Sequence, residues 1–315
     1  MWFRNIFPAK SPRQNQTGGE SNEGLLSPHA LRQLDHLALN AARTLPGLQA
    51  GARPSRRQKP SFDFRDHRRY VPGDDARYID WKASARQEHI FVRQGEQPKD
   101  APVYLLIDCS KSMAWGEPPK FKSELQLAAG LGYLALAHGD RLSVLPFAGR
   151  LLPPFGPVSG KGQVPAMLNF IGGLSFHTRS DLRPVLKYLS TRAARGGLLL
   201  LLSDFLNLEG LEDLLDRFRE PAWDVVLLQM LHPEEIQPTL RGNFELIDTE
   251  TGRRSNYDLD AAALQQYAFH FEERRAALDR LCDEHNAFFT SLSTGGSLEH
   301  DLLPKLVSTR IVRVL

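Results

Sequence analysis

The sequence predicts an α/β fold, with a doubly wound and mostly parallel β-sheet and an N-terminal extension. Short, fully apolar runs such as residues 198–202 recur from residue 103 onward, and they alternate with longer stretches that have helical spacing. Such runs are typical of strands buried on both faces, and their alternation with helices is typical of a parallel sheet. Small residues also crowd the helical stretch 120–138, which allows close packing of that helix on a sheet.

The elements are expected in the following order. Residues 1–24 are rich in Pro, Ser, Asn, Gln and Gly, so we expect a disordered tail there. Ser27 and Pro28 predict the start of a helix, and apolar residues at helical spacing continue that helix to Leu45. A basic loop follows at 47–60. The rest is predicted to contain strands at 103–107, 141–147, 198–203, 224–231 and 287–292, helices at 120–138, 163–171, 181–194, 211–218, 260–285 and 298–306, and a hairpin at 244–257.

Length and composition limit the class of protein. At 315 residues there is room for one large domain and an attached segment, which we place at 100–315 and 25–99. The net charge of +2 argues against an electrostatic nucleic-acid binder, and no apolar stretch is long enough to cross a bilayer. Two cysteines far apart in sequence suit a reducing compartment. We therefore predict a cytoplasmic protein with no nucleic-acid partner and no transmembrane segment.

An acid and two hydroxyls follow the first predicted strand of the sheet, at Asp108, Ser110 and Ser112. Ligands of open α/β sheets bind at the carboxyl ends of strands, and carboxylate and hydroxyl oxygens suit Mg²⁺ or Mn²⁺ better than zinc. This Asp-x-Ser-x-Ser pattern resembles the metal-ion-dependent adhesion site of von Willebrand factor A domains. The alternative is that these residues only form a turn or cap a helix. Lys111 would weaken metal binding unless its side chain points away.

Two further segments would meet this loop at the same edge of a parallel sheet. Asp204 comes directly after the apolar strand at 198–203. In von Willebrand factor A domains a hydroxyl from a loop just before a helix completes the metal shell; Ser180 is the best match for it, and Thr178 is the alternate. The alternatives are that Asp204 caps the following turn and that Ser180 is the N-cap of the helix at 181–194.

A second motif occupies residues 70–86. It begins with a Pro-Gly-Asp-Asp turn, and arginines and aspartates then alternate around Trp81, which predicts an internal clamp of Arg–Asp pairs; a partner-binding surface is the alternative. The positions that define the motif are Tyr70, Gly73, Asp74, Arg77, Asp80, Trp81 and Arg86. This stretch resembles the signature of the bacterial domain-of-unknown-function 58 family. The resemblance implies a von Willebrand factor A-like domain and a gene neighbourhood with a MoxR-type AAA+ ATPase, and it implies no known reaction.

The functional prediction combines the metal motif with the absence of recognisable catalytic and nucleotide-binding motifs. The sequence has no phosphate-binding Gly-rich loop, no phosphatase-type Asp-x-Asp and no Gly-x-Ser-x-Gly elbow, and its histidines lack metal-ligand spacing. We therefore predict a non-enzymatic adaptor whose Mg²⁺ or Mn²⁺ is completed by an acidic side chain of a protein partner, with a MoxR-type ATPase as the partner that the resemblance implies. The alternative is a hydrolase that uses the same metal to activate water.

Overall fold

The structure is a computed structural model that describes residues 25–39, 64–69, 91–95, 101–177, 179–194, 196–207, 209–220, 222–247 and 254–315. The chain divides into two units. One unit contains residues 1–48 and 101–315, and the other contains residues 49–100. In the second unit, β2 (Phe64–Arg69) and β3 (Phe91–Gly95) pair antiparallel. The signature segment 70–86 lies outside the described residues, so the clamp stays a prediction.

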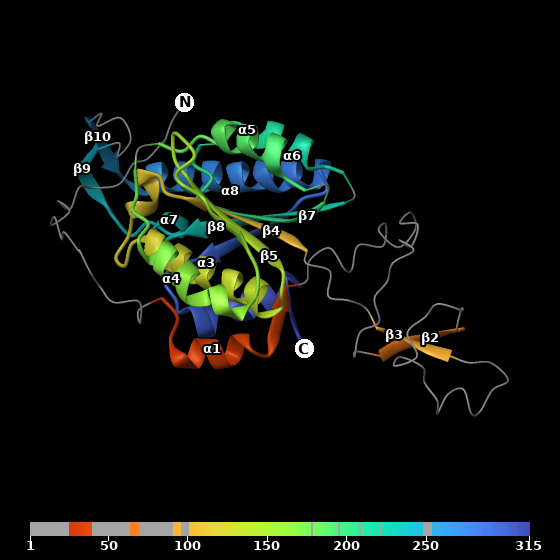
Figure 1. Cartoon of the computed structure of the whole chain (residues 1–315). Helices are drawn as coiled ribbons and strands as arrows, with labels where there is room; N and C mark the ends of the chain where they lie inside the picture. Colours follow the sequence, from red (N-terminus) through yellow and green to blue (C-terminus); the bar gives the residue numbers. More distant parts are fainter. Residues whose placement is uncertain are drawn as a thin grey trace. The chain divides into compact units, whose positions relative to one another are not determined.

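A six-stranded sheet forms the centre of the larger unit (Figure 1). Its strands are β4 (Pro102–Asp108), β5 (Arg141–Phe147), β6 (Phe155–Val158), β7 (Gly197–Ser203), β8 (Trp223–Leu231) and β11 (Phe288–Ser293). They lie in the order β11-β8-β7-β4-β5-β6, and all pairs are parallel except β5 with β6. The strand order therefore reverses between β4 and β7. The predicted doubly wound, mostly parallel sheet is confirmed.

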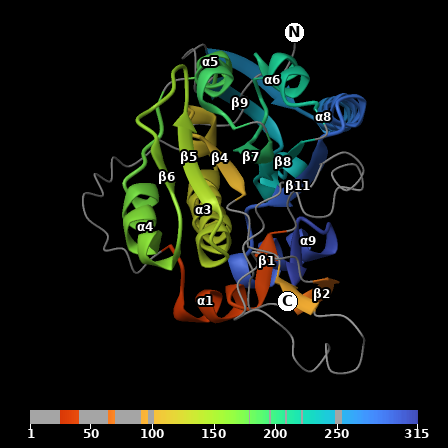
Figure 2. The same ribbon diagram turned by 45° about the vertical axis from the view of Figure 1, so that its right-hand side comes forward.

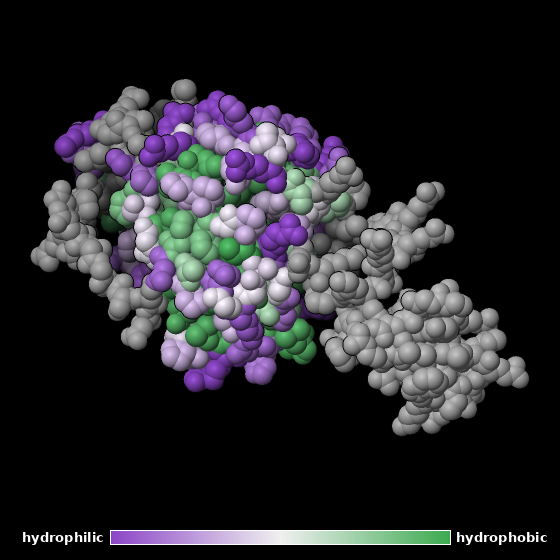
Figure 3. Space-filling model, in the orientation of Figure 1, coloured by the Kyte–Doolittle hydropathy of each residue, from purple (hydrophilic) through white to green (hydrophobic). Residues whose placement is uncertain are grey.

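Helices cover both faces of this sheet (Figure 1). One layer contains α1 (Pro28–Leu34), α3 (Lys120–Ala137), α4 (Val164–Gly172) and α9 (Leu303–Ser308); the other contains α5 (Arg183–Arg192), α6 (Leu211–Arg217) and α8 (Ala261–Glu284). In β4, Leu105 and Ile107 pack into the first core, whereas Tyr104 and Leu106 pack into the second. This alternation is the two-residue period of a strand buried on both sides. Polar residues cover the outer side of α5 and α6 (Figure 3).

Smaller elements complete the unit. They are the 3₁₀ turns Lys111–Ala114 and Lys161–Gln163, the short helix α7 (Pro233–Ile236), the π-helical turn Leu298–Leu302, and the strands β9 (Gly242–Ile247) and β10 (Arg254–Leu259). β9 and β10 pair antiparallel, with Ile247 opposite Arg254, so the predicted hairpin is confirmed. The turn between them lies outside the described residues.

The N-terminal helix is shorter than predicted. Ser27 caps α1 as expected, because its hydroxyl accepts a hydrogen bond from the amide of Ala30 at 2.9 Å. The prediction that the helix continues to Leu45 is wrong, since α1 ends at Leu34 and residues Leu37–Leu39 form strand β1. β1 pairs antiparallel with β12 (Val312–Val314), and all three of its residues are buried. A pairing partner far away in sequence thus overrides the local helical pattern.

The edge strand β6 depends on a glycine. Gly156 has a φ of +89°, and a Cβ added there would overlap the backbone carbonyl oxygen of Leu142. Gly160 has a similar φ of +88°, but nothing lies within 4 Å of the Cβ it lacks. Both glycines therefore relieve backbone strain, and only Gly156 also avoids a clash.

We expect Gly156→Ala to lower the free energy of unfolding by about 1–3 kcal/mol more than Gly160→Ala, because only the first substitution forces β5 and β6 apart. Urea unfolding of the two variants measures the difference. Gly160→Ala controls for the cost of positive φ, so equal losses of stability would show that the close approach to Leu142 is unimportant.

Candidate functional site

Asp108 lies where the strand order of the sheet reverses, at the carboxyl end of β4. Ligands of doubly wound sheets bind at such reversal points. The side chain is fully buried. Its Oδ1 accepts a hydrogen bond from the amide of Ser110 at 2.9 Å, and its Oδ2 accepts one from the hydroxyl of Ser203 at 2.6 Å. Because Ser203 is the last residue of β7, the second bond joins the ends of the two strands that flank the reversal point.

The two predicted hydroxyls beside Asp108 lie close together. Ser110 and Ser112 are both buried, and their Oγ atoms are 2.9 Å apart. The 3₁₀ turn that starts at Lys111 brings them to the same side of the loop. The Lys111 side chain itself is exposed, so its charge is directed to solvent and away from these oxygens. The carboxylate and both hydroxyls of the motif are thus adjacent.

Asp204 is also buried at this edge, but its carboxylate is already engaged. Its Oδ2 accepts a hydrogen bond from Lys120 Nζ at 2.8 Å, and its Oδ1 accepts one from the amide of Leu206 at 3.1 Å. The second bond realises the turn-capping role that the sequence left open. Glu235 Oε1 lies 2.7 Å from the same Lys120 nitrogen, and no part of the Lys120 side chain is exposed.

Glu124 adds a further buried acid, one turn after Lys120 on α3. Its Oε1 accepts a hydrogen bond from the backbone amide of Asp108 at 3.0 Å. Its Oε2 has no hydrogen-bond partner within the described part of the chain. Residues four apart on a helix share one face, so α3 directs both side chains at the ends of β4 and β7. The sequence reasoning did not identify Lys120, Glu124 or Glu235.

These groups give the site an excess of acid. Burial, with the nearby charges of Asp108 and Asp204, raises the pKa of Glu124 well above its usual range. Burial and the charge of Asp204 raise the pKa of Asp108 to about 6. Burial alone would lower the pKa of Lys120, but the adjacent Asp204 and Glu235 outweigh it and raise that pKa. Four carboxyl groups and one ammonium are therefore buried at this edge, and the ammonium pairs with only two of the acids, Asp204 and Glu235. Such an environment favours an additional cation.

The loop that contains Ser180 lies beside the same edge. The amide of His177 donates to the carbonyl of Cys109 at 2.6 Å, and the side chain of Asn207 donates to the carbonyl of Ser180 at 2.6 Å. Ser180 is buried, and within the described residues no hydrogen bond joins its hydroxyl to Asp108 or Asp204. Thr178 lies outside the described residues.

The alternative role of Ser180 as a helix N-cap is wrong. Helix α5 begins at Arg183, two residues later than predicted, and its N-cap is Leu182. The carboxylate of Asp181 accepts a hydrogen bond from the amide of Arg183 at 2.9 Å, so Asp181 satisfies the start of the helix. Ser180 is thus not used as a cap.

The donor set determines which metal could be held. In the residues that the structure describes, no three His, Cys, Asp or Glu side chains are grouped as ligands of one ion. The adjacent donors are the Asp108 carboxylate and the hydroxyls of Ser110 and Ser112. An all-oxygen set of this kind fits Mg²⁺ or Mn²⁺ and does not fit zinc.

Comparison with known proteins places the chain in a family. Residues 66–277 match the family described as protein of unknown function DUF58. This protein belongs to the DUF58 family. The match covers the signature segment 70–86, and it confirms the family that the sequence resembles.

Relatives of this DUF58 protein add no established activity. Uncharacterized proteins of Mycobacterium bovis and Mycobacterium tuberculosis are 26% identical over 287 residues, which is 89% of each chain. An aerotolerance-related membrane protein from Bacteroides fragilis is similar in structure, with a TM-score of 0.42 and 15% identity over 67% of this chain and 98% of its own. BatB from Bacteroides thetaiotaomicron has a TM-score of 0.41 and 13% identity over 67% of this chain and 97% of its own. Both structural likenesses are weak.

No helix among the described residues has both the length and the apolar character to span a membrane.

Proposed function

We propose that this DUF58 protein is a non-enzymatic, metal-dependent adaptor that binds a protein partner at the carboxyl edge of its sheet. The observation that carries this proposal is the adjacency of Asp108, Ser110 and Ser112 at the point where the strand order reverses. These three residues would hold Mg²⁺ or Mn²⁺, with Ser180 as a further ligand. Asp204 would contribute through a water molecule, because Lys120 and the amide of Leu206 already occupy its oxygens.

Such a set of ligands leaves a coordination position for a carboxylate of the partner. The surface beside the site also suits a protein. Phe176 is 50% exposed, and it directly precedes His177, whose amide binds the loop of Asp108. Its ring packs edge-on against Phe121, which fixes an apolar side chain at the rim of the site. The proposed partner is a MoxR-type AAA+ ATPase in the cytoplasm, which rests on the family resemblance.

The test is recovery of the complex from extract of the native cells. We expect the wild-type protein to retain its partner in Mg²⁺ and to lose it in EDTA, and we expect Asp108→Ala to lose it in both. Asp181→Ala is the matched control, because Asp181 lies near the same edge but pairs with Arg183. Equal recovery for all samples would contradict the proposal. Metal-dependent turnover of p-nitrophenyl phosphate that Asp108→Ala abolishes would instead support the hydrolase.

A further inference from the structure

The outer edge of β11 is a second surface where the structure is open to a partner. β11 is the last strand of the sheet, and within the described residues its only strand partner is β8. Figure 2 shows it at the end of the sheet, with α8 on one side and α9 on the other. In an edge strand, the backbone amide and carbonyl groups of alternate residues point away from the sheet, where they can form hydrogen bonds with an added strand.

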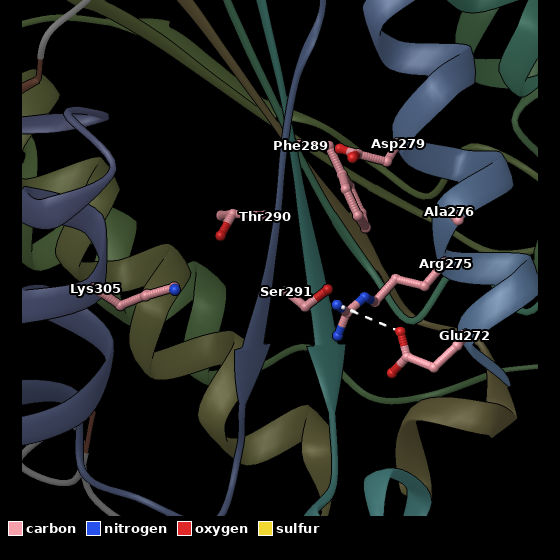
Figure 4. Close-up of a pocket in the computed structure, with 8 residues that line it drawn as sticks. All are labelled: Glu272, Arg275, Ala276, Asp279, Phe289, Thr290, Ser291 and Lys305. Carbon is pink, nitrogen blue, oxygen red and sulfur yellow. Dashed lines mark ion pairs between the residues drawn. The ribbon is translucent and has the colours of Figure 1, made fainter. Parts of the chain in front are cut away.

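A pocket of about 350 Å³ runs along this edge. Its lining includes Phe289 and Ser291, which face α8, and also Thr290, which lies on the opposite side of the strand (Figure 4). Successive residues of a strand point to opposite faces of the sheet. A pocket that contacts all three must therefore pass around the free edge of β11, in the space that a seventh strand would occupy.

The walls of this pocket carry opposite charges. Asp279 lies on the α8 wall and Lys305 on the α9 wall, and both are exposed. Neither side chain has an ion-pair partner in the part of the chain that the structure describes. Arg275, in contrast, is paired with Glu272 at 3.4 Å on the same helix. An occupant of the edge would therefore meet an unpaired acid on one side and an unpaired base on the other.

We propose that the edge of β11 binds an extended peptide segment of a partner protein as an additional strand, with a basic residue next to an acidic one. Neighbouring residues of the added strand point to opposite faces, so the basic side chain meets Asp279 and the acidic side chain meets Lys305. This surface is independent of the proposed metal site, which lies at the carboxyl ends of β4 and β7.

A second copy of the protein is a poorer occupant. Residues Phe288–Ser293 contain no charged side chain, so a second β11 would leave Asp279 and Lys305 without opposite charges from the added strand. The other explanation is that Lys305 only guards the edge against aggregation, as charged residues at sheet edges often do. The experiment below separates these possibilities.

The probe is a fluorescent peptide, Thr-Val-Lys-Glu-Val-Thr, and its binding to the full chain is measured by fluorescence anisotropy. The control peptide, Thr-Lys-Val-Glu-Val-Thr, has the same composition but places both charges on one face of a strand. We expect the probe to bind about fivefold more tightly than the control, because the control can form an ion pair with only one wall of the pocket at a time. Methylation of the backbone nitrogens of the probe should abolish binding.

Protein variants test the two walls. Lys305→Glu should weaken binding of the probe by about fivefold, and the double variant Asp279→Lys with Lys305→Glu should restore it, since the peptide can shift by one residue and reverse its faces. Both side chains are exposed, so folding should be unaffected. Three results would overturn the proposal: no binding of the probe, equal binding of the two peptides, or a wild-type dimer that Lys305→Glu dissociates. If the first of these results is accompanied by self-association of Lys305→Ala, the role of Lys305 is only to protect the edge from aggregation.

Discussion

Lys120→Met is expected to lower the free energy of unfolding by about 3–5 kcal/mol, because it leaves Asp204 and Glu235 buried without their counter-charge. Lys120 Nζ lies within 2.8 Å of an oxygen of each acid, and neither acid is more than slightly exposed. Removing one member of a buried ion pair is costly because the remaining charge has lost both its partner and its water. Urea unfolding at neutral pH measures the loss.

The same substitution at an exposed pair is the control. Lys161 approaches Asp35 at 3.5 Å, with its side chain 64% exposed, so Lys161→Met should change stability little. If Lys120→Met does not fold, the triple variant with Asp204→Asn and Glu235→Gln should recover a folded protein, since it removes all three charges. A Lys120→Met protein as stable as the wild type would show that the Lys120 pairs contribute nothing to folding.

The second large effect is expected on metal affinity. The wild type should bind Mg²⁺ or Mn²⁺ with modest affinity and prefer them to Ca²⁺, because the set of ligands is compact, all-oxygen and low in charge. Asp108→Ala removes the carboxylate of that set, so we expect the metal affinity to fall by at least about tenfold. A loss of about tenfold is already typical when a residue that only hydrogen-bonds to a metal ligand is replaced. Isothermal titration calorimetry at millimolar metal measures both values.

Glu124→Gln is the matched control for this measurement. Burial already favours the neutral form of Glu124, and Gln keeps an oxygen that can accept the bond from the amide of Asp108. Metal affinity and stability should therefore stay close to those of the wild type. If the wild type gives no heat with either metal, the metal-dependent adaptor is wrong. If Glu124→Gln binds as poorly as Asp108→Ala, the ionised form of Glu124 contributes to the site.

Most of the fold could be predicted, because the apolar patterns that indicate its strands and helices lie within short stretches of the sequence. The stretches that form β4, β5, β7 and β8 are mostly apolar, and this pattern depends on no distant contact. The sequence does not predict β6, because Gly and Pro are rare inside strands; an edge strand tolerates both Gly156 and Pro157. The sequence does not predict β1 and β12, because each strand is stabilised by pairing with the other and no local pattern indicates a pairing between such distant segments.

The residues of the candidate site likewise divide into those that the local sequence predicts and those that only the folded chain brings together. Asp108, Ser110 and Ser112 lie within one loop, so their spacing alone predicts that they are adjacent. The sequence does not single out Lys120 and Glu124, because charged residues near the start of a helix usually face water. A signal was nevertheless available, since both lie on the helical face that continues with Leu127 and Leu131, which are buried. Glu235 could not be assigned, because only the folded chain brings α7 to Lys120.

The pairing of β1 with β12 constrains when the protein can finish folding during its synthesis. β1 is among the first of the described segments to be made, and its partner, Val312–Val314, is among the last. Among the described residues β12 is the strand that pairs with β1, so on the ribosome this pair cannot form until residues 312–314 emerge, whereas the central strands can already pair. A nascent chain stalled shortly before that point would thus have an assembled central sheet but an unpaired β1. We expect this incomplete form to be the one that most needs a chaperone.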